Sequence, residues 1–323
     1  MIIKRKETWG IIQYDTSKYR FSYIQNNGKE AIPYINKPVL LNCDLTLKCN
    51  MDCIHCVAMD LKREVDEDLT ISKETIDWIN NSPFMVIVIT GGEPFLNEYQ
   101  ERLIILLQEI KGKGLIIDTN GTITPSKSLC DAIRKTRALV RISWDSARPQ
   151  DEIYLRRKNS NAKVDDDINL EYYYKKIAMI GWFRKHDINI AVQSVVHRRN
   201  LTSIIDMPAK LHELSIRQWY LQRFIPSYIV AEDEKLRVGT SEYDKITAKL
   251  IKRCHREKIE CITKRDKRYN SVFLLVGDRL LYTQGEKPRQ KILLGDTRSE
   301  IEYFRYVSPA DHSERYYRQG QKL

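Results

Sequence analysis

Hydrophobic and polar positions follow two alternating patterns between residues 39 and 257. Short apolar or β-branched runs bounded by Gly, Pro, Asn or Asp predict strands, and apolar residues recurring every three or four positions predict helices. The expected strands are Val39–Leu45, Phe84–Thr90, Leu115–Asp118, Leu139–Trp144, Ile188–Val196 and Arg217–Phe224. The expected helices are a segment capped by Ser72, then Glu101–Lys111, Ser126–Thr136, Tyr172–Lys185, Ile204–Leu214 and Ser241–Glu257. This alternation predicts an α/β fold with a parallel sheet, either open or barrel-like.

The segments that flank this alternation have a different pattern. Trp9–Tyr14 and Tyr19–Ile24 surround a turn and predict an N-terminal β-hairpin. Ser271–Leu275 and Leu280–Thr283 predict a second hairpin near the C-terminus. We therefore expect a β-rich leader at residues 1–38, a core at 39–230 and a small C-terminal α+β extension at 231–323.

One long segment inside the core, Asp145–Leu170, is charged and irregular. We interpret it as a solvated insertion. The alternative is a lid or substrate loop over the mouth of the barrel, because functional residues often lie on long loops of this kind.

Composition and charge limit the possible partners and compartment. The 323 residues include 54 Lys or Arg and 43 Asp or Glu, which gives a net charge of +11. This charge fits either a merely basic surface or a site for an anionic partner, such as a nucleotide, a phosphorylated metabolite or an acidic peptide. No nucleic-acid-binding motif accompanies the basic residues, so specific nucleic-acid binding is not expected. Because the sequence has no signal-peptide pattern and no apolar run of membrane-spanning length, we expect a soluble, cytoplasmic protein.

The cysteines indicate a metal centre. Seven cysteines, an odd number with three in one motif, favour a reduced compartment and metal binding over a disulfide framework. Cys49, Cys53 and Cys56 have a C-x3-C-x2-C spacing directly after the first expected core strand. Three thiolates on one loop can hold a metal centre and leave one coordination position open. A zinc site with His55 or Cys43 as fourth ligand fits this spacing as well as an iron–sulfur cluster does.

The next expected strand, Phe84–Thr90, ends in Gly91-Gly92-Glu93-Pro94. The two glycines remove side chains, so backbone amides can approach a small polar group closely and positive φ angles are allowed. Glu93 adds a carboxylate at the same place, and Pro94 ends the strand. By itself this tetrapeptide is typical of a tight turn, but on the strand after the three-cysteine loop it indicates a functional site.

The two motifs together resemble those of the radical S-adenosylmethionine (radical SAM) superfamily over roughly residues 39–225. The resemblance implies a partial (β/α)6 barrel in which Cys49, Cys53 and Cys56 hold a [4Fe–4S] cluster and SAM chelates the fourth iron. In such enzymes the reduced cluster cleaves SAM to methionine and a 5′-deoxyadenosyl radical, which abstracts hydrogen from the substrate. It also implies an electron donor such as flavodoxin or ferredoxin.

The resemblance further implies roles for residues at the ends of the expected strands, where the active sites of β/α barrels lie. Gly91, Gly92 and Glu93 match the motif that contacts the SAM methionyl amine. Further contacts with SAM or substrate are expected at Asn120 of a T-N-G turn, Ser143, Asp145, Arg156 or Arg157, Gln193 and the segment Leu221–Phe224. No side chain is assigned a catalytic role.

The other cysteines bear on the subclass. Cys43 falls in an expected strand and Cys130 in an expected helix, so both are expected in the core. Cys254 and Cys261 are expected to be ordinary semi-buried thiols. No cysteine follows Cys261, so auxiliary clusters of the kind found in many peptide-modifying relatives are not expected.

Two substrate classes stay open. The N-terminal hairpin resembles the leaders of maturases for ribosomally made peptides, which implies modification of a peptide side chain and is the interpretation we favour. The basic charge and the C-terminal region without cluster ligands instead resemble viperin-like enzymes, which dehydrate a nucleoside triphosphate. Cys53-Ile54-His55-Cys56 departs from the C-G-F-C usual in those enzymes. The alternative outside enzymes is a zinc-binding structural or nucleic-acid adaptor.

Overall fold

The computed structural model describes residues 1–26, 35, 37–56, 69–157, 167–224, 233–264, 273–283, 291–296 and 303. Its first unit is a small antiparallel sheet in the order β1-β2-β3. The strands are β1 (Ile2–Glu7), β2 (Gly10–Asp15) and β3 (Arg20–Gln25). The expected N-terminal hairpin is confirmed as β2 and β3. The sequence did not indicate β1, because the segment IIKRKE lacks a clear alternation of apolar and polar residues.

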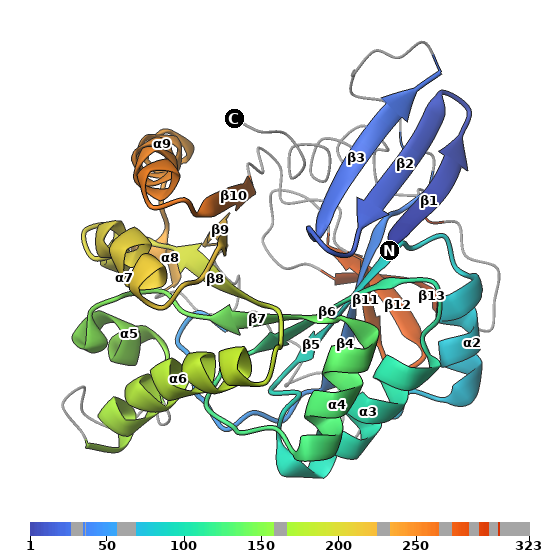
Figure 1. The fold of residues 1–323 in the computed structure, drawn as a ribbon, viewed down its shortest axis with the longest axis horizontal. Helices are drawn as coiled ribbons and strands as arrows, with labels where there is room; N and C mark the ends of the chain where they lie inside the picture. The colour runs from blue at the N-terminus through green and yellow to red at the C-terminus, as the bar shows by residue number, and fades with distance from the viewer. Residues whose placement is uncertain are drawn as a thin grey trace.

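A second sheet of ten strands forms the body of the molecule, in the order β10-β9-β8-β7-β6-β5-β4-β11-β12-β13 (Figure 1). The strands are β4 (Leu40–Thr46), β5 (Val86–Gly91), β6 (Gly114–Thr119), β7 (Leu139–Ser143), β8 (Ile190–Val196), β9 (Gln218–Arg223), β10 (Glu260–Lys264), β11 (Phe273–Val276), β12 (Arg279–Thr283) and β13 (Lys291–Asp296). Pairing is parallel from β10 to β11 and antiparallel for β12 and β13. The expected mostly parallel α/β sheet is confirmed. In the described part of the chain, β10 and β11 extend the six expected parallel strands at both ends.

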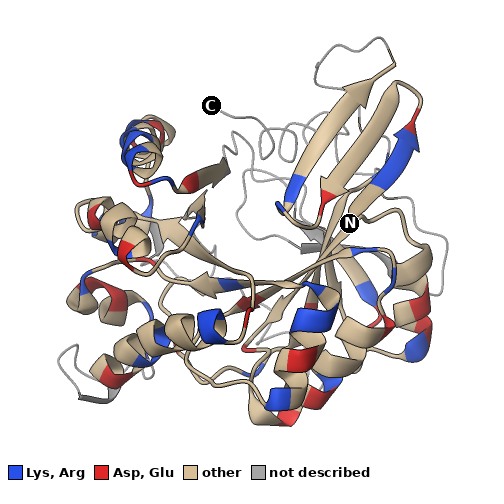
Figure 2. Cartoon of the chain, in the orientation of Figure 1, with Lys and Arg blue, Asp and Glu red and all other residues tan. Residues whose placement is uncertain are grey.

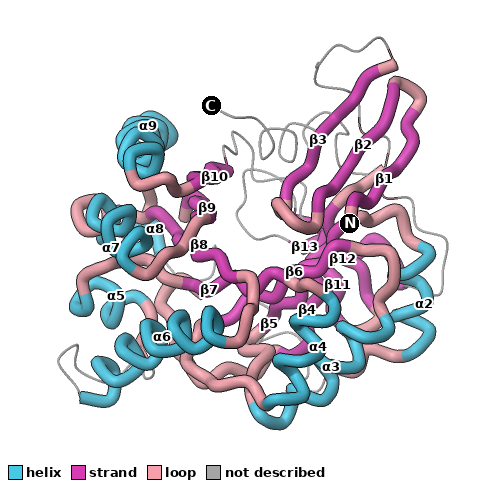
Figure 3. The backbone as a smooth tube through the Cα atoms, in the orientation of Figure 1, coloured by secondary structure: helices cyan, strands magenta, loops and turns pink. Residues whose placement is uncertain are grey.

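Helices lie along the outer side of this sheet, whose strands follow an arc (Figure 3). Those described are α2 (Lys73–Asn81), α3 (Gln100–Glu109), α4 (Lys127–Thr136), α5 (Pro149–Leu155), α6 (Asp167–Lys185), α7 (Met207–Glu213), α8 (Asp233–Leu236) and α9 (Thr240–Arg256). The Ser72 and Ser126 side chains cap α2 and α4 by accepting hydrogen bonds from the Thr75 and Leu129 amides. Among the described residues, no helix combines the length and apolar character that crossing a membrane requires.

The two faces of the large sheet bury different layers. On β5, Ile87 and Ile89 lie in the core beneath the helices, whereas Val86 and Val88 belong to a second apolar cluster on the inner face. The alternation follows from the two-residue period of a strand. The second cluster joins the N-terminal sheet to the amino-terminal halves of the strands, through Ile12, Tyr14 and Phe21 on one side and Ile116, Leu139 and Ala191 on the other. The N-terminal sheet therefore closes the amino-terminal end of the large sheet.

The carboxyl-terminal half of the inner face is polar. Asp118 on β6, Arg141 on β7 and Gln193 on β8 share this face by the same alternation. Arg141 donates hydrogen bonds from Nε and Nη2 to the Asp118 carboxylate, at 2.6 and 2.7 Å. Its guanidinium lies 5.1 Å from the centre of the Tyr220 ring. The inner face thus has an apolar amino-terminal half, which we call the floor, and a polar carboxyl-terminal half, which we call the polar walls.

The segment Asp145–Leu170 was predicted to be a solvated insertion, and this prediction was wrong for Asp145 and Glu152, whereas Arg148, Gln150 and Leu170 are exposed. Asp145 and Glu152 are 0% and 2% exposed. Helix α5 follows the turn at Asp145, and α6 begins at Asp167 rather than at Tyr172. The carboxylates of Asp145 and Glu152 therefore have their partners inside the protein, whereas Arg148 of the same segment is exposed. The alternative of a lid depends on residues 158–166, which lie outside the described residues.

Candidate active site

The three expected metal ligands lie on one loop, residues 47–56, which we call the cysteine loop and which begins where β4 ends. Cys49, Cys53 and Cys56 are each half-buried. Burial raises the pKa of the Cys53 thiol, the Arg156 guanidinium lowers it, and the thiols of Cys56 and Cys49 raise it further. The thiols of Cys56 and Cys49 are thus near enough to Cys53 to influence its ionisation.

The glycines of the β5 turn bring that turn against the start of the cysteine loop. Gly92 and Glu93 donate their backbone N–H groups to the carbonyls of Thr46 and Lys48, at 2.6 and 2.8 Å. A Cβ atom at Gly92 would lie 1.8 Å from the Lys48 oxygen. Gly91 has a φ of +121°, and a Cβ atom there would lie 2.1 Å from the Thr46 oxygen. Side chains at either glycine would push the two backbones apart.

The end of α5 holds the other side of the cysteine loop. The backbone N–H of Asp52 donates to the Arg157 carbonyl at 2.7 Å, and that of Ile54 donates to the Leu155 carbonyl at 3.1 Å. The loop is therefore fixed by backbone hydrogen bonds from two separate elements. The sequence had indicated the β5 turn but not α5.

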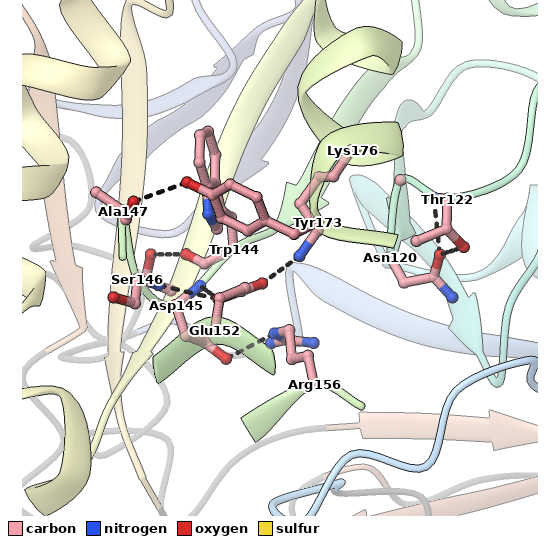
Figure 4. Close-up of polar contacts among 12 residues, drawn as sticks. Asn120, Thr122, Trp144, Asp145, Ser146, Ala147, Glu152, Arg156, Tyr173 and Lys176 are labelled. Atoms are coloured by element: carbon pink, nitrogen blue, oxygen red, sulfur yellow. Dashed lines mark hydrogen bonds and ion pairs between the residues drawn. The ribbon is translucent and has the colours of Figure 1, made fainter. Parts of the chain in front are cut away.

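Asn120, in the turn after β6, contacts the same loop. Its Nδ2 donates to the Asn50 Oδ1 at 2.8 Å and lies 3.9 Å from the Cys49 sulfur. Its Oδ1 accepts hydrogen bonds from the backbone N–H and the hydroxyl of Thr122, at 2.9 and 2.6 Å (Figure 4). The Asn50 Nδ2 in turn donates to the Thr122 hydroxyl at 2.9 Å. The orientation of the Asn120 amide is thus set by this network.

Glu93 is fully buried and joins the turns after β5 and β6. Its Oε1 accepts from the Phe95 N–H at 2.9 Å and the Thr119 hydroxyl at 2.7 Å, and its Oε2 accepts from the Asn120 N–H at 2.7 Å. Burial raises the pKa of Glu93 to about 7, against the lowering effect of these three hydrogen bonds. The carboxylate therefore supports the architecture of the site.

Asp145, at the end of β7, is engaged on both carboxylate oxygens. Oδ2 accepts from Arg156 Nε at 2.6 Å and lies 3.1 Å from His55 Nε2. Oδ1 accepts from the Val195 N–H at 2.7 Å. Burial by itself would raise the pKa of Asp145, but Arg156 and His55 outweigh it and hold that pKa well below its usual range.

A buried ion pair next to Asp145 was not predicted from the sequence. Glu152 of α5 accepts hydrogen bonds from the Asp145 and Ser146 amides at 2.7 and 3.0 Å, and pairs with Lys176 of α6 (Figure 4). The side chains of Lys176 and Glu152 are 3% and 2% exposed. The sequence did hold a signal for the helix, because Pro149 stands at its first position and acidic residues follow in its first turn.

Comparison with known proteins decides the family. A sequence model described as the Radical SAM superfamily matches residues 44–206, about half of the chain. The chain belongs to the radical SAM superfamily. The matched segment contains both the cysteine loop and the β5 turn. Radical SAM enzymes use a [4Fe–4S] cluster and SAM, so the metal centre is expected to be of this kind.

Two curated proteins of similar sequence differ from each other in the reaction that their names describe. The AdoMet-dependent heme synthase of Methanosarcina barkeri is 25% identical over 224 residues, which cover 67% of this chain and 58% of that protein. The S-adenosylmethionine-dependent nucleotide dehydratase of Lacinutrix mariniflava is 28% identical over 197 residues, which cover 57% of this chain and 38% of that protein. The chain thus matches less than two thirds of either relative's length.

Solved radical SAM structures share the fold. Streptococcus suis SuiB bound to SAM has a TM-score of 0.61 at 14% identity, covering 81% of this chain and 71% of that one. SuiB has also been solved with its precursor peptide SuiA. The protein anSMEcpe with bound AdoMet has a TM-score of 0.61 at 15% identity, covering 85% and 82%; a further structure of it holds AdoMet and the Kp18Cys peptide.

The cysteine loop suits a radical SAM cluster in its donor set. In a four-iron cluster each thiolate binds its own iron, so three thiolates leave the fourth iron for another ligand. The sulfurs therefore need not converge on one point. Among the residues that the structure describes, no group of three or more His, Cys, Asp or Glu is arranged around a single metal-ion position.

Two other expected radical SAM site residues lie side by side on the inner face. Ser143 of β7 and Gln193 of β8 are partners in the parallel register. Ser143 is half-buried. Gln193 Oε1 is buried and has no hydrogen-bond partner within the described part of the chain. A buried acceptor of this kind is normally satisfied, so it marks a position where a ligand or a water molecule would donate. Of the segment Leu221–Phe224, Leu221 lies in the core beneath the helices.

His197, directly after β8, is a candidate that the sequence did not reveal. Its Nδ1 accepts from the Arg199 and Asn200 amides at 3.1 and 3.3 Å, so the proton of the neutral ring lies on Nε2. Burial lowers the pKa of His197 to about 3, with a further contribution from His55, whose ring lies 5.8 Å away. The Nε2 atom is buried without a partner in the described residues. It is therefore a hydrogen-bond donor beside the cysteine loop.

Proposed function

We propose that this chain is a radical SAM enzyme in which Cys49, Cys53 and Cys56 hold the [4Fe–4S] cluster and a peptide side chain is the substrate. One observation carries the proposal. The cysteine loop of the family lies at the carboxyl ends of the parallel strands and is fixed there from two sides, by the β5 turn and by the end of α5. A fixed loop with three thiolates and one open position is what SAM binding at a cluster requires.

When bound, the reduced cluster and SAM supply a 5′-deoxyadenosyl radical that takes a hydrogen atom from the substrate. The chain's own residues bind and orient these partners. We assign the SAM site to residues around the cysteine loop and on the adjoining strand ends, namely Gly91, Gly92, Glu93, Asn120, Ser143, Arg156 and Gln193. Asn120 Nδ2, 3.9 Å from the Cys49 sulfur, is placed to stabilise a thiolate, and hydrogen bonds to sulfur tune the potential of a cluster.

The closed amino-terminal end of the sheet supports radical chemistry in the interior. The N-terminal sheet packs its apolar residues, among them Tyr14 and Phe21, onto the floor of the inner face. Substrate would therefore approach from the carboxyl ends, next to the cysteine loop. An external low-potential donor, such as flavodoxin or ferredoxin, would supply the electron.

A peptide substrate is supported by the solved relatives of similar fold. SuiB and anSMEcpe have both been solved with peptides, and their fold covers more than four fifths of this chain. The second candidate is a nucleotide, favoured by the sequence match to a nucleotide dehydratase and by the net charge of +11. Figure 2 shows that Lys and Arg are spread over the described helices rather than gathered at one place, so we favour the peptide.

Anaerobic reconstitution tests the chemistry. The wild-type chain is expected to take up about four irons and to release 5′-deoxyadenosine from SAM after reduction. Cys53→Ala should lose both properties, whereas Cys261→Ala, a matched half-buried thiol on β10, should keep them. Zinc uptake without iron, or SAM cleavage by Cys53→Ala at the wild-type rate, would contradict the proposal.

Deuterium transfer tests the substrate class. The reconstituted chain is incubated with SAM and either a pool of perdeuterated peptides, including any short peptide encoded beside the gene, or perdeuterated nucleoside triphosphates. Deuterium in 5′-deoxyadenosine from the peptide pool supports the proposal. Label from the nucleoside triphosphates with none from the peptides would establish the second candidate instead.

A further inference from the structure

We propose that Asp145 is a positioning residue that holds the cysteine loop, through His55, and the end of α5, through Arg156, in one fixed arrangement at the carboxyl end of β7. This inference rests on the proposed function, because it assigns to Asp145 the task of placing the loop that carries the cluster. The sequence had suggested that Asp145 contacts cofactor or substrate directly.

The polar groups of Asp145 already have partners within the protein. Arg156 and His55 contact Oδ2, and the Val195 N–H donates to Oδ1. Its backbone N–H donates to Glu152 Oε2 at 2.7 Å, and its carbonyl accepts from Asn200 Nδ2 at 2.8 Å. A side chain engaged in this way is suited to holding its neighbours and poorly suited to binding a further ligand.

The contacts of Asp145 come from three separate parts of the chain. His55 belongs to the cysteine loop, Arg156 follows α5, and Val195 lies on β8. The residues on either side of Arg156 are those whose carbonyls accept the loop's backbone hydrogen bonds from Asp52 and Ile54. One carboxylate therefore connects the loop to its support by two routes, a direct one through His55 and an indirect one through Arg156.

Charge and burial make this arrangement sensitive to Asp145. The Asp145 side chain is 0% exposed, and those of His55 and Arg156 are 4% and 12% exposed. A buried guanidinium that loses its carboxylate partner is strongly unfavourable and tends to move toward water. Movement of Arg156 would displace the carbonyls of its two neighbours, and with them the hydrogen bonds that fix the cysteine loop.

The variant Asp145→Asn tests this role in the chain without metal. Asparagine keeps the acceptor for Val195 but turns an amide donor toward Arg156 and His55. Hydrogen exchange at the Asp52 and Ile54 amides, and alkylation of the three loop cysteines by iodoacetamide, should each become roughly tenfold faster or more. The matched control is Asp131→Asn, which removes the partner of Arg134 in an exposed pair on α4 and should leave both rates unchanged.

The pattern of exchange separates positioning from general stability. Faster exchange confined to the cysteine loop and residues 155–157 supports the proposal. Equal acceleration at buried β6 amides such as Ile117 would show a general loss of stability and overturn it, as would rates in Asp145→Asn equal to those of the wild type. Arg156→Lys, which keeps the positive charge but loses Nε, should loosen the same amides to a smaller extent and serves if Asp145→Asn does not fold.

A second readout uses the cluster-loaded chain. If the loop is misplaced, the EPR spectrum of the reduced Asp145→Asn protein with SAM should differ from that of the wild type. Should the wild-type chain take up no iron, the proposed function fails, while the exchange and alkylation rates of the metal-free chain still decide the role of Asp145.

Discussion

At the residue scale, Glu93 shows how burial and hydrogen bonding set the chemistry of one carboxylate. It is the carboxylate of the motif that suggested the family, yet its oxygens accept hydrogen bonds from Phe95, Thr119 and Asn120. The sequence predicted a carboxylate at this strand end. It could not predict these three donors, two of which come from another strand, Thr119 at the end of β6 and Asn120 in the turn after it.

The raised pKa of Glu93 predicts a pH dependence of stability. Burial raises that pKa from 4.5 to about 7, so the folded state binds the proton more tightly than the unfolded state. The resulting stabilisation is complete below about pH 4.5 and is lost as the pH rises through about 7. Between about pH 5.5 and pH 8 the free energy of unfolding should fall by about 2 kcal/mol on this account.

Denaturant unfolding of Glu93→Gln measures this effect. The variant lacks the titrating group. The unfolding free energy of the wild type minus that of the variant should therefore fall by about 2 kcal/mol from the lower to the higher pH. Glu98→Gln, which changes an exposed glutamate in the short 3-10 helix after this turn, is the control and should follow the wild type. A difference that is constant with pH would contradict the raised pKa.

Gln193 gives a second prediction at this scale. Because Oε1 is buried without a partner in the described residues, replacing the amide with the apolar side chain of Gln193→Met should leave the free energy of unfolding unchanged or raise it by up to about 1 kcal/mol. If a ligand donates to Oε1, affinity for SAM measured by calorimetry should fall roughly tenfold, the worth of one hydrogen bond. Loss of stability without loss of affinity would show a structural role instead.

At the element scale, the site depends on close contact between the β5 turn and the cysteine loop. The six strands β4 to β9 were correctly predicted as strands from the sequence, because their β-branched runs are distinctive. It missed β10, whose segment Glu260–Lys264 is short and polar at its ends. It also misread residues 145–157 as solvated, because the partners that bury their charges, among them His55 and Val195, lie far away in the sequence.

The variant Gly92→Ala tests that contact. Its Cβ would lie 1.8 Å from the Lys48 oxygen, so the loop must move, and the free energy of unfolding should fall by about 1–3 kcal/mol together with the iron content after reconstitution. Gly181→Ala on α6 has nothing within 4 Å of its Cβ and should raise the free energy of unfolding by about 0.5–1 kcal/mol. Normal iron uptake by Gly92→Ala would show that the loop does not need this packing.

At the scale of the whole molecule, the two halves of the inner face of the large sheet differ in polarity. The N-terminal sheet covers the apolar floor, and the polar walls end at the cysteine loop. The family could be predicted because two short motifs resemble it, and the cofactors followed from that resemblance, since the cysteine spacing alone fits a zinc site equally well. The substrate could not be predicted, because it depends on which side chains line the inner face. The direction of each side chain is set by the tertiary fold and cannot be read from the sequence alone. The domain boundaries near residues 38 and 230 stay predictions.

The central claim is that three thiolates on the cysteine loop hold a cluster with one position open to SAM. Low-temperature EPR of the reduced, reconstituted wild-type chain, recorded with and without SAM, tests it most directly. The account predicts a reduced [4Fe–4S] signal whose shape and g values change when SAM is added, because SAM binds the iron that has no thiolate. The absence of any iron–sulfur signal, or a cluster signal that SAM leaves unchanged, would contradict it.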